Sequence, residues 1–288
     1  TQRLHSKRVR FYVRKLSKSI YAQLNHSRYD AVIVASCNPY TVNKYYEIMD
    51  TIDDNIPRIF IDGGDFSELA GDLDRLGGKD IYEKIISKKP FDLIFKREYI
   101  INKNYPSNVY PLPMCFNYDL MPNLNNNYKY DVSFWGVETA QIRSDALDLL
   151  QDKFDCKSNG TVRNQVMKKY KRKGTFYLQE IASSKIGLNF RGGGWDTLRL
   201  WELTGMGCFV ISQKLQIHID NNFIDKEEIV YCKDDLSDLV ELCEYYLEHD
   251  DERKRIALNA RKKVEQFHSD ISRAEYIINK IKEFKNVN

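Results

Sequence analysis

The sequence lacks the long apolar run that a membrane-spanning helix requires. None of the hydrophobic stretches among its 288 residues approaches the roughly 20 residues that cross a bilayer. The basic N-terminus is not followed by the apolar segment of a secretory signal peptide. These absences argue against an integral membrane protein and favour a globular, cytoplasmic one, for which a hydrophobic content of 42% supplies a core.

Cysteine and histidine are also few, and neither type is spaced for a metal site. The six cysteines include no C-x-x-C pair, and no two of the five histidines stand at a separation typical of metal ligands. Scattered single cysteines in a large chain indicate a reducing compartment. From this spacing we expect no metal ion and buried free thiols, and we expect no bound cofactor either.

The excess of positive charge is small but concentrated. The formal net charge is +3, while residues 1–29 alone contribute +8 and no acid, so the remainder carries about −5. The lack of an overall basic field argues against a general nucleic-acid-binding protein. The basic segment predicts a helix with one apolar stripe, which either packs on the protein or contacts an anionic membrane through residues 3–18.

Short apolar runs alternate with helical patterns along most of the chain. Strands are expected at 31–35, 56–61, 91–95, 109–112, 130–135, 154–157, 186–190, 208–212 and 228–232. Helices are expected at 41–53, 78–88, 140–152, 161–172, 175–183, 197–205, 235–248, 251–266 and 270–284. This alternation predicts an α/β fold of two Rossmann-like domains with parallel sheets that face a cleft.

The polar, asparagine-rich stretch 117–130 shows neither a helical nor a strand pattern, and we interpret it as a crossing between the domains. Only three or four strands are expected before it, which suits a reduced or truncated N-terminal domain. Because ligands of parallel sheets bind at the carboxyl ends of strands, the loops at 62–65, 136–143 and 191–199 are the informative ones.

The most specific local pattern spans residues 183–212, where a strand, a glycine loop, a helix, a glycine turn and a strand follow one another. The three glycines 192–194 allow the backbone to approach a ligand closely. Asp196 or Thr197 can cap the next helix, whose free amide groups suit a diphosphate. Trp195 either packs within the protein or lies over a base or sugar.

Two arginines and a glutamate flank this glycine loop. Arg191 and Arg199 can place fixed positive charge beside a diphosphate. Glu202 lies one helical turn after Arg199, and its carboxylate can accept hydrogen bonds from two neighbouring hydroxyl groups such as those of a ribose. The alternative is a surface ion pair between Arg199 and Glu202.

This stretch resembles the CgeB-like, or group 1, branch of the GT-B glycosyltransferases. The pattern is carried by Ser184-Lys185-Ile186, Leu188-Asn189, Arg199, Glu202, Gly205 and Gly207. The resemblance covers roughly residues 130–285 and is weaker over 30–125.

The resemblance implies a metal-independent, hexosyltransferase-like enzyme. Its donor would be a nucleotide sugar, UDP- or GDP-linked, and its acceptor a glycan, a lipid-linked molecule or another compound. The family's organisation implies an acceptor-side domain over 1–122 and a nucleotide-sugar-binding domain over 123–267. A final helix in 268–288 would return to the first domain.

The resemblance also assigns roles to individual residues. Glu202 would bind the ribose, while Arg199 and Arg191 would neutralise the diphosphate. Gly136 would lie beneath the diphosphate, with Arg143 nearby. The remaining expected donor-binding residues are Gly192, Gly193, Trp195, Asp196 and Thr197.

One departure from the family pattern leaves the stereochemistry open. Many retaining GT-B enzymes carry a glutamate eight positions before the ribose glutamate, where this chain has Gly194. An inverting enzyme requires a base beside the acceptor hydroxyl. Asp62 and Asp65 follow a predicted strand and are the candidates; alternatively, Asp62 caps a turn and Asp65 caps the next helix.

Two other classes of function stay open at this stage. A nucleotide-binding module of the same fold without turnover would fit Gly194 and the short first domain. A nucleic-acid-binding or nucleic-acid-modifying protein would fit the basic segments at 1–28 and 168–173, although the charge distribution does not favour it.

Overall fold

The computed structural model describes residues 29–124, 128–151, 153–154 and 175–287, which form an α/β fold with two four-stranded sheets. Contacts divide the chain into two compact units, 1–63 with 70–95 and 64–69 with 96–288. The expected N-terminal helix, the helix at 161–172 and most of the strand at 154–157 lie outside the described residues.

The first sheet contains the four strands expected in the first part of the chain. Its strands, in spatial order, are β1 (Val32–Val34), β2 (Arg58–Asp62), β3 (Leu93–Lys96) and β4 (Val109–Pro111). The pairing of β1 with β2 is parallel. The helical segments here are α3 (Pro39–Ile48), the 3₁₀ turn η2 (Met49–Thr51), α4 (Gly71–Arg75) and α5 (Lys79–Lys88).

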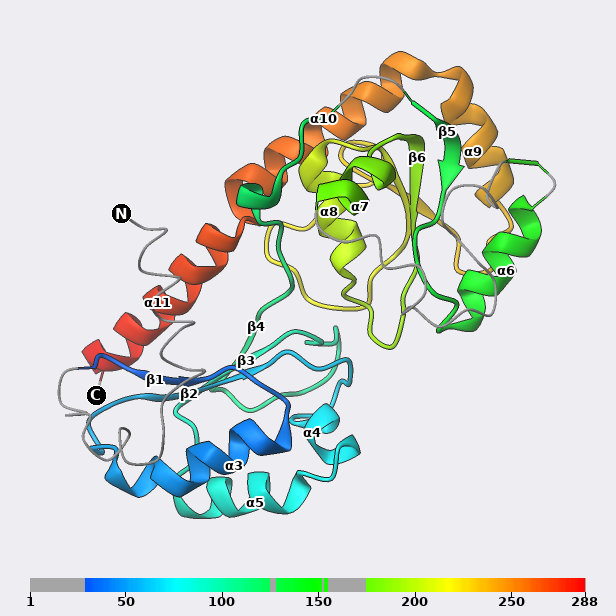
Figure 1. Ribbon diagram of the computed structural model, residues 1–288. Helices are drawn as coiled ribbons and strands as arrows, with labels where there is room; N and C mark the ends of the chain where they lie inside the picture. The colour runs from blue at the N-terminus through cyan, green and yellow to red at the C-terminus, as the bar shows by residue number, and fades with distance from the viewer. Residues whose placement is uncertain (1–28, 125–127, 152, 155–174, 288) are drawn as a thin grey trace. The chain divides into compact units, whose positions relative to one another are not determined.

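Helix α3 shows how the sequence begins an element in this part of the fold. Asn38 accepts the backbone N–H of Tyr40, and Pro39 occupies the first helical position, where no N–H is needed. The helix then buries Tyr45, whose ring stacks on Phe91 with 5.3 Å between ring centroids. Figure 1 shows α3 and α5 side by side on one face of the sheet.

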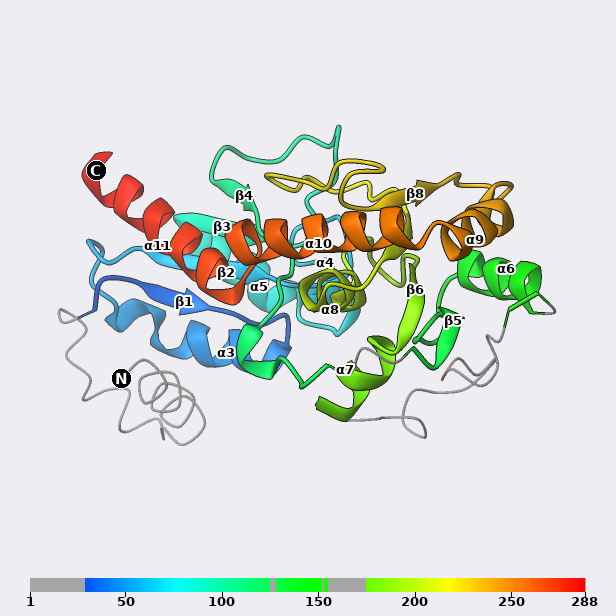
Figure 2. The same cartoon turned by 90° about the horizontal axis from the view of Figure 1, so that it is seen from above.

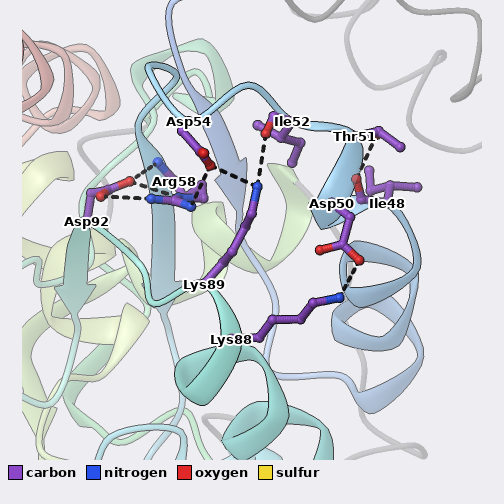
Figure 3. A network of polar contacts seen from close by, with 9 residues as sticks. All are labelled: Ile48, Asp50, Thr51, Ile52, Asp54, Arg58, Lys88, Lys89 and Asp92. Carbon is purple, nitrogen blue, oxygen red and sulfur yellow. Dashed lines mark hydrogen bonds and ion pairs between the residues drawn. The ribbon is translucent and has the colours of Figure 1, made fainter.

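Ion pairs join the segments that lead into β2 and β3 (Figure 3). The guanidinium group of Arg58 pairs with Asp92 at 3.1 Å, and the same carboxylate accepts the Arg58 backbone N–H at 2.6 Å. Nearby, the ammonium group of Lys89 donates to Asp54 at 2.9 Å. Since Asp92 bonds both the backbone and the side chain of Arg58, this pair fixes the start of β2 against the segment before β3.

The second sheet is parallel throughout. Its strands, in spatial order, are β5 (Tyr130–Ser133), β6 (Ser184–Asn189), β7 (Val210–Gln213) and β8 (Val230–Cys232). The helical segments are η3 (Tyr118–Leu120), α6 (Gln141–Leu150), α7 (Thr175–Ile181), α8 (Leu198–Met206), α9 (Leu239–Glu248), α10 (Asp250–Phe267) and α11 (Asp270–Val287). Among the described helices of both parts of the chain, η3 and the five-residue α4 were not expected from the sequence, because they are too short to show a helical period.

Two apolar clusters pack against this second sheet. One contains Leu147 and Leu150 of α6 and Tyr246 of α9. The other contains Leu200 of α8 and Val264 of α10. Figure 2 shows α10 crossing α8 and leading into α11. None of the described helices is long and apolar enough to span a membrane.

Helix α11 contacts the segment that follows β4. The guanidinium group of Arg273 donates to the carbonyl groups of Pro113 at 3.0 Å and Met114 at 3.3 Å. The ammonium group of Lys280 lies 5.2 Å from the ring centroid of Tyr110. These contacts lie within the second compact unit, and the predicted domain boundaries at 122/123 and 267/268 stay predictions.

Candidate functional site

The glycine loop, residues 191–197, connects the carboxyl end of β6 to the start of α8. Each of its three glycines is approached by a different side chain of the protein. The nearest atoms to an added Cβ would be Arg143 Nη2 at position 192, Asp65 Oδ2 at position 193 and Glu98 Oε1 at position 194, all under 3.0 Å. The close approach of these three side chains is therefore enough to require glycine at positions 192–194. The approach of a ligand, which the sequence suggested as the reason for the glycines, stays a prediction.

Arg143 holds two loops together, and its predicted place near the diphosphate stays a prediction. Its guanidinium group donates to the carbonyl groups of Val137 (2.6 Å), Phe190 (3.0 Å) and Arg191 (2.8 Å), and to the Thr139 hydroxyl (3.1 Å). The side chain is buried, and burial together with the charge of Arg199 lowers its pKa to about 9. Four of its five N–H groups are thus used within the protein.

Arg199 reaches from the first turn of α8 to the end of β5. Its Nε donates to the Trp135 carbonyl at 2.6 Å, and its guanidinium group lies 4.4 Å from the ring centroid of Phe134. Any side chain at Gly136 would collide with this guanidinium group. Nη1 of Arg199 is buried and has no hydrogen-bond acceptor among the described residues, while burial lowers the pKa of the group.

Glu202 lies one turn further along α8 and meets a residue that the sequence did not indicate. The hydroxyl group of Tyr177, on α7, interacts with the Glu202 carboxylate and lies near the guanidinium group of Arg199. Burial raises the pKa of Glu202 and of Tyr177. A tyrosine within a helical pattern gives no functional signal by itself, because only the packing of α7 beside α8 brings the three side chains together.

Arg191 and Trp195 pair with one another across the glycine loop. The Arg191 guanidinium group lies 4.5 Å from the centroid of the Trp195 ring, a cation–π contact. Nε of Arg191 is buried without an acceptor in the described part of the chain. Trp195 therefore carries an arginine on its ring, and the expected contact of this ring with a base or sugar stays a prediction.

Thr197, rather than Asp196, caps α8. Its side chain accepts the Leu200 N–H at 3.4 Å. The buried Asp196 carboxylate accepts the Met114 N–H at 2.6 Å and the Trp201 indole N–H at 2.7 Å, and burial raises its pKa. Both carboxylate oxygens of Asp196 thus hold protein groups, and its predicted donor contact stays a prediction.

The amide groups that precede α8 already bind an anionic group of the protein. The N–H groups of Trp195 and Asp196 donate to the Glu98 carboxylate at 2.8 and 2.9 Å. Glu98 is only 1% exposed, and burial raises its pKa. The sequence interpretation missed Glu98, although its place just after the expected strand 91–95 could have indicated it.

The two candidate bases occupy different environments. Asp62, at the end of β2, is 1% exposed and accepts the Ala70 N–H at 2.9 Å and the Cys37 thiol at 3.4 Å. These contacts match the alternative in which Asp62 stabilises a turn. Asp65 is half exposed, forms an ion pair with Arg97 and lies against the glycine loop. It does not cap the next helix, because α4 begins at Gly71 with Ala70 as its N-cap.

A sequence model of the glycosyl transferase-like family matches residues 120–279, which is more than half of the chain. The chain belongs to this family. The match includes the whole second sheet, the glycine loop and α8. No curated protein shows significant similarity to the chain.

Solved structures with low sequence identity share the fold. HepE from Anabaena, solved with UDP-glucose, has a TM-score of 0.59 and 9% identity over 92% of this chain and 81% of its own. Sucrose-phosphate synthase from Thermosynechococcus elongatus has a TM-score of 0.59 and 9% identity, over 91% of this chain and 76% of its own. An α-glucosyltransferase solved with UDP and a 13-mer DNA has a TM-score of 0.56 and 14% identity, over 88% of this chain and 80% of its own. This chain therefore has the GT-B fold that its sequence resemblance predicted.

Proposed function

We propose that this glycosyltransferase moves a hexose from a UDP- or GDP-linked donor to a glycan or lipid-linked acceptor without a metal ion. Family membership supports the reaction class. Structural neighbours solved with UDP-glucose or UDP support a nucleotide-sugar donor. The observation that carries the proposal is the arrangement of Arg199, Glu202 and Tyr177 beside the glycine loop.

Arg199 offers a hydrogen-bond donor, Nη1, for which the described residues supply no acceptor. A buried N–H group without an acceptor costs about 1–3 kcal/mol, so a ligand that accepts this hydrogen bond recovers that free energy. Burial also disfavours the guanidinium charge, and an anionic ligand would offset this effect. A diphosphate has both properties. Arg191, whose Nε has no acceptor among the described residues, would add a second cationic contact.

Glu202 would bind the ribose of the nucleotide. Its carboxylate already accepts the Tyr177 hydroxyl and retains lone pairs for the two hydroxyl groups of a ribose. With Arg199 on the diphosphate, α8 would hold the nucleotide by two groups one helical turn apart. Two arginines would then neutralise the leaving diphosphate, which a metal ion does in other transferases.

Asp65 is the proposed base at the acceptor hydroxyl if the reaction inverts the anomeric centre. In that reaction the acceptor oxygen bonds to the anomeric carbon, and the bond from this carbon to the diphosphate oxygen breaks. The acceptor proton passes to the Asp65 carboxylate, and the electron pair leaves with the diphosphate. Asp65 is preferred to Asp62 because it is exposed and lies beside Gly193.

A panel of UDP-, GDP-, ADP- and CMP-sugars tests the donor. A bound donor stabilises the native state by about 2.7 kcal/mol at one hundred times its dissociation constant, which raises the melting temperature. Slow release of free nucleotide would establish turnover. Binding without release, with or without acceptors, would instead support a nucleotide-binding module that lacks catalysis.

We further propose a cytoplasmic location with peripheral contact between residues 3–18 and anionic lipid, as their basic charge suggests. A nucleic-acid acceptor is the second candidate. It is supported by the eight basic residues in 1–29 and by the similarity to an α-glucosyltransferase solved with DNA. Steeply salt-dependent binding to duplex DNA would favour this second candidate.

A further inference from the structure

Glu98 is a buried carboxylate that has no role in the proposed transfer. It lies two residues after β3, and its oxygens accept the backbone N–H groups of Trp195 and Asp196 at 2.8 and 2.9 Å. Its exposure is 1%, so solvent does not compensate for its charge. The two amide bonds hold the part of the glycine loop that leads into α8.

The absence of a side chain at Gly194 permits this arrangement. A Cβ there would lie within 3.0 Å of Glu98 Oε1 and Cδ, closer than real Cβ atoms approach. Position 194 is also where the family pattern often has a glutamate. The chain therefore has a carboxylate next to position 194, but a different segment of the sequence supplies it.

Neighbouring groups also hold the same stretch. The Asp196 carboxylate accepts the Met114 N–H and the Trp201 indole N–H, so it ties the loop to α8 and to the segment after β4. Arg97 Nε lies 3.5 Å from Glu98 Oε1 and provides compensating charge. Residues 194–196 are thus held by two buried carboxylates, that of Glu98 and that of Asp196 itself.

We propose that Glu98 is a positioning residue of the donor site, and that Gly194 is its steric complement. Its carboxylate sets the path of residues 194–196, and this path sets Trp195 against Arg191 and the start of α8 at Thr197. The orientation of α8 in turn aims Arg199 and Glu202. The proposal rests on the proposed function in one respect, namely that the ligand of this loop is the nucleotide sugar.

A double-mutant cycle tests the steric part without any ligand. Gly194→Ala should lower the melting temperature, because the methyl group collides with Glu98. In a Glu98→Ala background the same change should cost little, since the collision is gone. Gly63→Ala is the matched control, because a Cβ at Gly63 meets nothing within 4 Å. If Gly194→Ala behaves like Gly63→Ala, or if the two losses simply add, the proposal is overturned.

Glu98→Gln tests the positioning part while preserving size. A glutamine has one acceptor oxygen, so one of the two loop amides loses its partner. Hydrogen exchange at Trp195 and Asp196 should accelerate, and KM for the donor should rise about tenfold with kcat little changed, as expected for a loss of uniform binding. Unchanged exchange, or a fall in kcat at constant KM, would contradict the positioning role.

The donor-binding function and the positioning role of Glu98 can be contradicted independently. If the wild-type protein bound no nucleotide sugar, the proposed function would fall, whereas the melting-temperature cycle and the exchange rates would still decide whether Glu98 positions the loop. If the wild-type protein bound and turned over donor normally while Glu98→Gln changed neither exchange nor KM, only the inference would fall.

Discussion

At the residue scale, the proposed donor site depends on two side chains one helical turn apart. Arg199 and Glu202 are not an exposed ion pair, because Arg199 packs on Phe134 and bonds the Trp135 carbonyl, while Glu202 accepts a hydrogen bond from Tyr177. Both side chains are thus already oriented. A ligand would not have to order them and would lose little affinity to side-chain entropy.

Replacing Glu202 by alanine should weaken donor binding by about 1–3 kcal/mol, since the ribose hydroxyl groups lose their acceptor. Isothermal titration with the best donor from the sugar panel measures this. Arg261→Ala is a suitable control, because Arg261 lies outside the glycine loop and makes a partly exposed ion pair with Glu265. Equal donor affinity in the Glu202 and Arg261 variants would remove Glu202 from the site.

Asp62, the last residue of β2, and Asp65, which follows this strand, should behave differently when changed to asparagine. Asp65→Asn should lower kcat strongly with little change in donor affinity or melting temperature, because Asp65 is exposed and proposed as the base. Asp62→Asn should lower the melting temperature, because Asp62 is a buried acceptor for Ala70. If Asp65→Asn kept full turnover, the base would have to be sought elsewhere.

At the element scale, the junction between α10 and α11 contains a buried histidine. His268 accepts the Arg273 Nη2–H at Nδ1 (2.9 Å), and its Nε2–H donates to the Asn221 carbonyl at 3.1 Å. This arrangement uses the neutral ring. Burial and the charge of Arg273 lower its pKa to about 4, from an ordinary value near 6.5.

The free energy of unfolding should therefore fall as the pH drops from about 6.5 to about 4. In this window the unfolded state binds a proton at His268 that the native state does not, at a cost of at most about 3 kcal/mol. Urea unfolding at pH 7, 5.5 and 4.5 measures the slope. His268→Gln should flatten it, while His218→Gln, at an exposed site, should not. An unchanged slope in His268→Gln would contradict this assignment.

The sequence predicted the regular elements well, but not the contacts between them. Apolar runs such as 186–190 and 208–212 identified β6 and β7, since buried parallel strands are continuously apolar. The glycine loop and α8 were likewise recognisable. Glu98 and Tyr177 were missed because each reaches the site from a distant segment, and only tertiary packing brings them there. Nor did the sequence indicate that the N–H groups of Arg143 bond three backbone carbonyl groups and the Thr139 hydroxyl.

At the scale of the whole molecule, the two sheets give the chain the GT-B fold, and the family match over residues 120–279 includes the second sheet, the glycine loop and α8. Residues 1–29 carry eight basic residues and no acidic residue in a sequence whose net charge is only +3. Because this basic charge is concentrated near one end of the sequence, it could bring the protein to an anionic membrane, where a lipid-linked acceptor would lie.

Vesicle binding should require anionic lipid and fade as salt is added, because the interaction is electrostatic and screened. Replacing Arg8, Arg10, Arg14 and Lys15 by glutamine should abolish it. Sedimentation with vesicles of phosphatidylcholine alone, or with added phosphatidylserine, measures the effect. Equal binding to both vesicles, or binding to neither, would leave the segment without a membrane role.

The central claim is that Arg199 stabilises a leaving diphosphate, and steady-state release of free nucleotide from the preferred donor tests it most directly. The wild-type protein should release nucleotide. Arg199→Ala should lower kcat more than it weakens donor binding, because the contact strengthens as the leaving group gains charge. Normal turnover in Arg199→Ala, with an unchanged melting temperature, would contradict the account even though the fold is that of a glycosyltransferase.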